Sequence, residues 1–404
     1  MNKIRIIEAG NELSLGGTEH VMQLYSKYLN KDYFDVKVVS IHWGGARVKL
    51  IEDMGIPVVI LNGNIELLAD LLQKTDVFHW HCNGWMDELV FKIIKENRPK
   101  LVLHTNVFGE HDHSRFYDLI DYDLYVSSMI LIRRIHEDSN NSKDTAPDLF
   151  ISKRKVLANP VDVDHIISLL PSDEEVKNFK LLHKLTNSFI VGRIGRSDNY
   201  KFDLITLDGF AEFYKKVDNA MFLLVGATPE ILAYASQIGI ADQLIVFETT
   251  IELERLLVYY KSLDVFLAVS NIGESFGMVI AEAMTVGVPV ITVSTEAIDT
   301  DNAQIEMVDN NKNGLVVERN ASTIGNAILH LYQDESTRKR LSDSSSHKII
   351  EEYKADKIVA SLESLIFDYF NLAVPGYNKT LIKEYSEEMV DQYNYRLTDL
   401  WRKT

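Results

Sequence analysis

The amino-acid sequence predicts an α/β protein of two domains, each built on a parallel sheet with helices on both faces. Short runs rich in β-branched residues alternate with amphipathic helical segments along most of the chain. The alternation forms two series, one before and one after Asn159-Pro160. A chain of 404 residues also exceeds what one hydrophobic core usually holds.

The strands of the first series follow one another at short intervals. They are predicted at Ile4–Glu8, Val36–Ile41, Val58–Leu61, Val77–His81, Leu101–Thr105, Leu124–Val126 and Lys155–Leu157. Asn159-Pro160 ends this series, and residues 162–188 have the pattern of a helical linker.

The second series has the same character and is followed by a largely helical C-terminal region. Its strands are predicted at Phe189–Gly192, Ala220–Val225, Gln243–Phe247, Val265–Val269, Val288–Val293 and Gly314–Val317. Helices are predicted near 204–217, 252–262, 277–287 and 321–334. We therefore assign residues 1–165 to the first domain, 166–369 to the second and about 370–404 to a helical tail.

Charge and composition narrow the classes of function. The formal charge of −17 argues against nucleic-acid binding, because an acidic protein repels a polyanion. Residues 1–160 hold 19 basic and 22 acidic residues, against 23 and 37 in the rest, so we expect any anionic surface, including a membrane contacted peripherally, to meet the first half. The single cysteine, Cys82, fits a reducing compartment. The N-terminus lacks a signal-peptide pattern and the longest apolar stretch contains Glu274 and Glu282, so we expect a soluble cytoplasmic protein.

Segment 270–284 carries the most informative pattern. It follows a predicted strand and opens a predicted helix, whose first amides near Gly277 have no intrahelical acceptors and can hold an anion. Gly277 also allows a ligand to approach the backbone closely. Glu274 precedes the helix and Glu282 lies on its first turns, and two carboxylates beside an anion site suit the recognition of hydroxyl groups. The alternative is a buried helix with two satisfied carboxylates.

Two cations, Arg196 and Lys201, follow the strand that begins at Phe189. Together they can neutralise a diphosphate, the arginine through its planar fork and the lysine as a point charge. The alternative is a pair of solvated surface cations. Gly192 and Gly195 have the spacing G-x-x-G, so the dinucleotide fingerprint of an NAD-dependent oxidoreductase is missing.

The first domain offers weaker candidates. Gly16-Gly17 opens a predicted helix, where amides could meet a phosphate or an acceptor oxygen, although an ordinary strand-to-helix turn is the alternative. His104 ends a strand at the carboxyl edge of the sheet, where ligands of α/β proteins bind. His79 and His81 flank Trp80, and we expect one of them to face the ligand side and the other the packed side.

A metal site is not expected in the histidine-rich run from Glu110 to His113. The run lacks the helical i, i+4 pair of a zinc protease and has no thiolates. We expect it to be a loop that faces the acceptor.

The pattern Glu274-x7-Glu282, followed by Gly287-Val288-Pro289-Val290, resembles the E-x7-E signature of retaining glycosyltransferases of the GT-B fold, specifically glycosyltransferase family 4. The resemblance implies two Rossmann-like domains with parallel sheets that face each other across a cleft. The first domain would take the acceptor and the second the nucleotide-sugar donor. The helix over 355–369 would cross from the second domain to the first, so that the tail packs back on the first domain.

The resemblance also implies roles for particular residues. Glu274 would contact donor-sugar hydroxyls and Glu282 the ribose, while the backbone of Phe276, Gly277, Met278 and Val279 binds the sugar and the diphosphate. Gly195-Arg196 and Lys201 match the family's phosphate clamp, and Gly17 its N-terminal glycine loop. Leu103-His104-Thr105 matches a strand end whose histidine contacts the donor sugar or lies near the acceptor. The residues expected in catalysis are therefore Glu274, His104, Arg196 and Lys201.

The implied reaction transfers a sugar from a nucleoside diphosphate to an acceptor hydroxyl with retention at the anomeric carbon, without a metal or other cofactor. The acceptor could be a glycan, a lipid-linked glycan, a protein or a small molecule. Two departures affect the sugar side of the site: Ser270 follows a valine where the family often has proline, and residues 295–306 lack the usual Gly-Gly turn. The alternatives are a sugar-nucleotide hydrolase or epimerase of the same fold, and a sugar-nucleotide binding protein without turnover.

Overall fold

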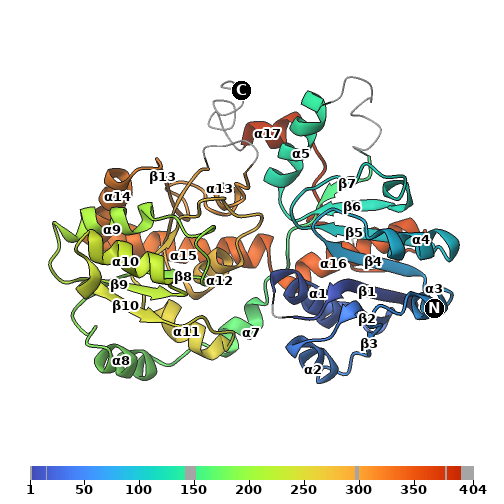
Figure 1. Cartoon of the computed structure of the whole chain (residues 1–404), viewed down its shortest axis with the longest axis horizontal. Coiled ribbons are helices and arrows are strands. Elements are labelled where there is room, and N and C mark those ends of the chain that lie inside the picture. Colours follow the sequence, from blue (N-terminus) through green and yellow to red (C-terminus); the bar gives the residue numbers. More distant parts are fainter. Residues whose placement is uncertain (1, 15, 142–151, 296–299, 378–379, 393–404) are drawn as a thin grey trace. The chain divides into compact units, whose positions relative to one another are not determined.

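The computed structural model describes residues 2–14, 16–141, 152–295, 300–377 and 380–392, and it contains two α/β domains (Figure 1). Met1–Pro160 with Glu352–Asn394 form the first domain, and Val161–Glu351 form the second. Each domain has one fully parallel sheet, so the predicted fold class is confirmed.

The sheet of the first domain has seven strands in the order β3-β2-β1-β4-β5-β6-β7. These strands are β1 (Ile4–Glu12), β2 (Phe34–Trp43), β3 (Val58–Ile60), β4 (Val77–Cys82), β5 (Leu101–Asn106), β6 (Tyr122–Tyr125) and β7 (Arg154–Val156). The helices are α1 (Gly17–Tyr28), α2 (Ala46–Glu52), α3 (Ile65–Leu72), α4 (Glu88–Glu96), α5 (Ser128–Asn141), α16 (Ala355–Tyr369) and α17 (Glu387–Gln392).

Helices cover both faces of this sheet, which explains why its central strands are apolar almost throughout. On one face, Ile6, Val36 and Leu103 pack with residues of α1 and α16. On the other face, Ile7 and Phe78 pack with residues of α3 and α4. A polar side chain in these strands is therefore buried whichever way it points, and it needs a partner inside the domain.

The sheet of the second domain has six strands in the order β10-β9-β8-β11-β12-β13. These strands are β8 (Phe189–Ile194), β9 (Ala220–Val225), β10 (Leu244–Phe247), β11 (Val265–Ala268), β12 (Val290–Val293) and β13 (Gly314–Val317). The helices are α7 (Val163–Ser168), α8 (Asp173–Leu182), α9 (Ile205–Tyr214), α10 (Pro229–Gln237), α11 (Leu253–Ser262), α12 (Met278–Val286), α13 (Gln304–Met307), α14 (Ala321–Gln333) and α15 (Glu335–Glu352).

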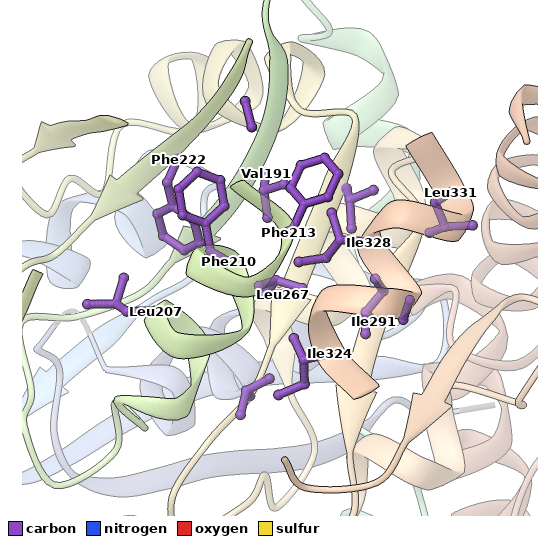
Figure 2. Packing of buried hydrophobic residues seen from close by; sticks show 14 of the residues in the cluster. Val191, Leu207, Phe210, Phe213, Phe222, Leu267, Ile291, Ile324, Ile328 and Leu331 are labelled. Atoms are coloured by element: carbon purple, nitrogen blue, oxygen red, sulfur yellow. The ribbon is translucent and has the colours of Figure 1, made fainter. Parts of the chain in front are cut away.

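The core of the second domain lies where α9 and α14 pack on the sheet (Figure 2). Phenylalanines of α9 and β9 meet the isoleucines of α14 over β8, β11 and β12. The two helices approach closely because glycines face each other: a Cβ on Gly209 would lie 2.4 Å from Ile324, and one on Gly325 would lie 2.9 Å from the Gly209 carbonyl oxygen. The two helices thus pack closely over one face of the sheet, and loops follow the carboxyl ends of its strands.

The C-terminal region differs from the assigned domain boundaries. Helix α16 was assigned to the second domain, but its apolar stripe, including Ile358, Leu362 and Ile366, lies in the core of the first. The sequence pattern showed a buried stripe and could not show which core receives it. Beyond α16, Lys383 forms an antiparallel bridge with Val156 at the edge strand β7, so this part of the tail packs on the first domain. Residues 393–404 of the predicted tail lie outside the described residues.

In the part of the chain that the structure describes, no helix combines the length and the apolar character needed to cross a membrane.

Candidate functional site

Two loops of the second domain meet at the carboxyl edge of its sheet and bring together Lys201 and Glu274. The strands before them, β8 and β11, are neighbours, and Phe202 bridges to Ser270. The Asn271 amide also donates to the Lys201 carbonyl oxygen at 3.0 Å. As a result, Lys201 Nζ lies 2.6 Å from Glu274 Oε2, with the lysine side chain 34% exposed and the carboxylate 7% exposed. The structure thus brings together two residues that the sequence predicted separately, one in the cation pair and one in the glutamate pair.

These loops border a cavity of about 110 Å³. Its walls come from the ends of β8 and β9, the loop after β8 and the start of α12. The lining residues are Arg193, Ile194, Gly195, Arg196, Asp198, Lys201, Phe202, Val225, Gly226, Glu274 and Val279. Three of them are cationic and two, Asp198 and Glu274, are acidic, so the lining carries a net positive charge that favours an anionic ligand.

Arg193 is a charged lining residue that was not among the predicted site residues. It is 5% exposed, and its Nε has no hydrogen-bond partner among the described residues. Burial lowers the pKa of its guanidinium, while the negative charge of Glu274 acts in the opposite direction. A buried guanidinium with an unused donor is costly unless a ligand completes it. The available signal was an arginine inside a strand whose other residues are apolar.

Arg196, by contrast, is exposed on the loop after β8, where the sequence placed it. Asp198 fixes the loop, because its Oδ1 accepts from the backbone amides of Tyr200 at 2.9 Å and Lys201 at 3.3 Å. The cavity is therefore lined by one exposed guanidinium (Arg196), one buried guanidinium (Arg193) and one ammonium (Lys201).

The start of α12 forms the remaining wall. Gly277 precedes the helix with φ of 95°, a left-handed conformation that favours glycine. No described side chain caps this end, so the first amides of the helix, at Met278 and Val279, are available to an anion. Phe276 is buried and anchors the loop, whereas Met278 and Val279 are half-buried.

Glu282 lies one turn further along α12 and is half-buried. Its Oε2 accepts a hydrogen bond of 2.9 Å from the hydroxyl of Tyr260 on α11. Burial raises the pKa of Glu282 to about 7, and the hydrogen bond from Tyr260 opposes that rise. The carboxylate is therefore close to its titration midpoint at neutral pH.

Two polar side chains, Asn302 and Gln304, support the Glu274 loop. They belong to segment 295–306, where the sequence lacks the family's usual Gly-Gly turn. Gln304 accepts from the Glu274 amide at 3.0 Å and donates to the carbonyl oxygen of Val293 at 3.0 Å. Asn302 accepts from Gln304 at 3.0 Å and from the Thr295 amide at 3.1 Å. Sequence reasoning missed both residues, because an asparagine and a glutamine in a loop carry no motif.

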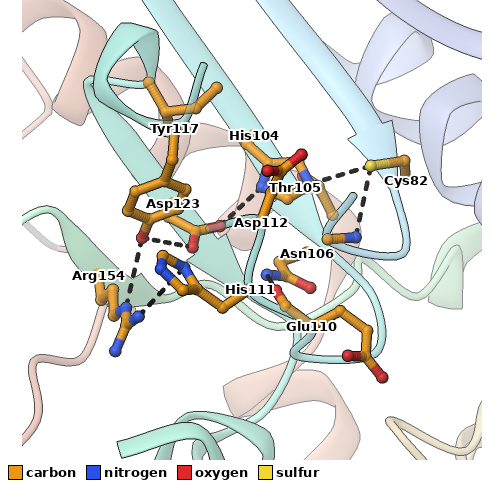
Figure 3. Close-up of polar contacts among 12 residues, drawn as sticks. Cys82, His104, Thr105, Asn106, Glu110, His111, Asp112, Tyr117, Asp123 and Arg154 are labelled. Atoms are coloured by element: carbon orange, nitrogen blue, oxygen red, sulfur yellow. Dashed lines mark hydrogen bonds and ion pairs between the residues drawn. The ribbon is translucent and has the colours of Figure 1, made fainter. Parts of the chain in front are cut away.

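His104 lies elsewhere than expected. Its side chain is completely buried in the first domain, with Nδ1 2.8 Å from Asp123 Oδ1 and Nε2 3.3 Å from Cys82 Sγ (Figure 3). Burial would lower its pKa, but Cys82 and Asp123 together raise it to about 10. Both ring nitrogens are thus engaged, so the expected direct contact of His104 with a sugar does not fit this geometry.

The contacts of His104 continue into a buried chain of polar groups (Figure 3). The Tyr117 hydroxyl donates to Asp123 Oδ2 at 2.9 Å, and Arg154 Nε donates to the Tyr117 oxygen at 3.3 Å. Arg154 also lies 3.4 Å from His111 Nδ1, which places part of the histidine-rich run inside the domain instead of at an open acceptor loop. His113 remains exposed.

His79 and His81 lie on the same face of β4, so the expectation that they face opposite sides is wrong. Side chains two positions apart in a strand point the same way. Their rings are 4.1 Å apart, and Glu8 Oε2 lies 2.9 Å from His79 Nδ1 and 2.6 Å from His81 Nε2. These three buried side chains form a group that could hold a metal ion. The short contact between His81 and Glu8 already supplies the carboxylate with a hydrogen bond.

Gly17 begins α1 and is exposed, and no described side chain caps that helix. A Cβ at this position would meet no atom within 4 Å. A ligand could therefore approach the backbone at Gly17, although the Glu19 carboxylate lies close to Gly16 at the same end of the helix.

Solved structures share the architecture of the two domains. The chain superposes on the crystal structure of a glycosyltransferase from Rickettsia africae ESF-5 with a TM-score of 0.74 at 16% identity, covering 92% of this chain and 100% of that one. It also superposes on HepE from Anabaena in complex with UDP, with a TM-score of 0.72 at 15% identity over 91% of this chain and 100% of that one. These likenesses identify the GT-B fold.

Residues 187–334, which include every residue that lines the cavity, match the family Glycosyl transferases group 1. It is 28% identical to N-acetyl-alpha-D-glucosaminyl L-malate synthase of Bacillus anthracis over 166 residues, 40% of this chain and 41% of that relative. It is 23% identical to alpha-monoglucosyldiacylglycerol synthase of Acholeplasma laidlawii over 322 residues, 73% of this chain and 76% of that relative. The match thus spans about two fifths of the first relative's length.

Proposed function

We propose that this protein is a retaining glycosyltransferase that moves a sugar from a nucleoside-diphosphate sugar to an acceptor hydroxyl. The observation that carries the proposal is the pair formed by Lys201 and Glu274 in a cavity that also holds Arg193, Arg196 and the uncapped start of α12. Cations and helix amides suit the diphosphate, and a carboxylate beside them suits sugar hydroxyls.

The proposed mechanism is a substitution on one face of the sugar. The bond from the anomeric carbon to the diphosphate oxygen breaks, the bond to the acceptor oxygen forms on the same face, and the acceptor proton passes to the departing phosphate. Lys201, Arg196 and the amides of α12 would stabilise the charge that grows on the leaving diphosphate. Glu274 is paired with Lys201 and is better suited to hold the sugar than to attack it.

The ribose and the acceptor complete the proposal. Glu282, near the cavity on α12, would accept hydrogen bonds from the ribose. The names of the two curated relatives include a small molecule, L-malate, and a lipid, diacylglycerol. We accordingly propose a small-molecule, glycan or lipid-linked acceptor, and a reaction that needs no metal because side-chain cations occupy the place where a metal would neutralise the diphosphate.

We also propose a cytoplasmic protein that contacts a membrane peripherally through its first domain. Trp43, Trp85 and Leu89 support this contact, because each is more than half exposed. Co-sedimentation with anionic vesicles checks this part of the proposal, and recovery of the whole protein in the supernatant would contradict it.

A thermal-stability screen tests the proposed activity. UDP-, GDP- and ADP-sugars are added in turn, and a ligand at 100 times its Kd stabilises the folded chain by about 2.7 kcal/mol. Product formation with candidate acceptors is then followed for the donor that binds. Donor breakdown that no acceptor alters would indicate a hydrolase or epimerase instead, and tight binding without turnover would indicate a sensor.

A further inference from the structure

Tyr260 touches two groups that lie one turn apart on α12. Its hydroxyl is 2.9 Å from Glu282 Oε2 and 3.2 Å from the Val279 carbonyl oxygen. The side chain is 0% exposed, and its ring lies 5.8 Å from the ring of Phe266 on β11. Tyr260 therefore reaches the site from behind α12 and is held in one place by packing.

A phenol has one proton, so it cannot donate fully to both acceptors at once. Burial and the Glu282 carboxylate raise the pKa of Tyr260, so the hydroxyl keeps its proton and acts as a donor. When Glu282 is ionised, that proton turns to the carboxylate. When Glu282 is protonated, its own O–H can donate to the phenol oxygen, and the phenol turns to Val279.

We propose that Tyr260 is a positioning residue for donor recognition, which holds the ionised Glu282 carboxylate in the orientation that accepts ribose hydroxyls while touching no part of the donor. This inference rests on the function proposed above. In this proposal Tyr260, a buried residue of α11, contacts both ends of the site. One contact is with Glu282, which would bind the ribose, and the other is with the first turn of α12, whose amides would bind the diphosphate.

The charged surroundings agree with this role. Arg193 on β8 and Glu274 in the loop before α12 act on the Tyr260 phenol with opposite signs. Helix α7, which packs against α12, carries Asp164 and His165. Because burial raises the pKa of Glu282 and the Tyr260 hydroxyl opposes this, loss of the hydroxyl favours the protonated carboxyl, which is a poorer acceptor.

The experiment compares Tyr260→Phe with Tyr259→Phe in the full chain. Tyr259 is the matched control, because it is 2% exposed on the same helix but its hydroxyl lies 2.7 Å from Arg255 Nε instead of Glu282. Calorimetry with UDP at pH 7 should show a loss of about 5- to 10-fold in affinity for Tyr260→Phe and little change for Tyr259→Phe. In the reaction, the donor KM should rise by a similar factor while kcat stays within twofold of the wild type.

Two further measurements separate positioning from a general packing defect. The affinity for UDP-glucose, whose diphosphate does not titrate near neutral pH, should rise from pH 6 to pH 8 in the wild type, and in Tyr260→Phe this rise should move to higher pH. In a Glu282→Gln background, Tyr260→Phe should cause no further loss, because the carboxylate that it positions is gone.

Equal losses from Tyr260→Phe with and without Glu282 would overturn the positioning role, as would unchanged UDP affinity in Tyr260→Phe. If the wild type binds UDP and the variant binds equally well, only the inference about Tyr260 fails. If the wild type binds none of UDP, GDP and ADP, the proposed function fails, and the role of Tyr260 fails with it.

Discussion

The two domains differ in how far the charged pairs beside their parallel strands are exposed. In the first domain, His104 and Asp123 are both completely buried and bind each other. Cys82 occupies the other ring nitrogen of His104, and the Tyr117 hydroxyl donates to the other carboxylate oxygen of Asp123. In the second domain, Lys201 and Glu274 also pair, but the lysine is 34% exposed and the pair borders a cavity. A charged pair at a strand end is therefore a ligand site only where the covering elements leave space beside it.

The largest expected effect is on the buried pair of the first domain. Asp123→Asn should destabilise that domain by about 3–5 kcal/mol, because it leaves a buried imidazolium without its counter-charge. Binding of UDP by the second domain should stay within twofold. Denaturant unfolding measures the loss, with the exposed Asp118→Asn as the control. A loss equal to that of the control would show that the His104–Asp123 pair is not charged.

The next effect separates the two glutamates of the second domain. Glu274→Gln should lower turnover about 100-fold with free UDP affinity nearly unchanged, since a misplaced sugar loses its reactive geometry. Glu282→Gln should show the reverse pattern, with free UDP and intact donor both bound about tenfold more weakly. Calorimetry and steady-state rates measure the two patterns. Equal weakening of free UDP in both variants would refute the assigned roles.

Lys201→Ala should reduce turnover by about 10-fold or more, because a hydrogen bond to a charged group contributes about 1.5–3 kcal/mol. Part of the loss would come from Glu274, which is left buried without its ammonium partner. Lys215→Ala is the control, since that side chain is 66% exposed and pairs with Glu212 on the surface. Activity within twofold of the wild type, with the fold intact, would remove Lys201 from the site.

The smallest expected effect is that of a chelator. EDTA should leave the rate within twofold, because the cations around the cavity take the place of a divalent ion at the diphosphate. Complete loss of activity that Mn²⁺ or Zn²⁺ restores would contradict this expectation. In that case Glu8, His79 and His81 would be the candidate metal ligands, and the metal content of the purified protein could be measured.

Features that depend on neighbouring residues could be predicted from the sequence, and features that depend on contacts between distant segments could not. Every predicted strand of both sheets is present, because burial on both faces requires long apolar runs that the sequence displays directly. Lys201 and Glu274 could each be proposed for the site because each follows a predicted strand, whereas the structure shows that the two strands are neighbours and that the two side chains pair. Tyr260 and Gln304 could not be found, since their roles depend on which groups other elements bring into hydrogen-bond distance.

The sequence by itself determined the fold class, the two sheets and the position of the loop that carries Glu274 and Glu282, because periodicity and turn residues act over a few neighbouring positions. Only the tertiary structure decided that α16 packs on the first domain, that His104 is buried between Asp123 and Cys82, and that Tyr260 supports Glu282. The physical reason is that burial and partner choice are set by packing between distant segments. A histidine or a tyrosine has the same local pattern whether its polar atom meets a ligand or another side chain.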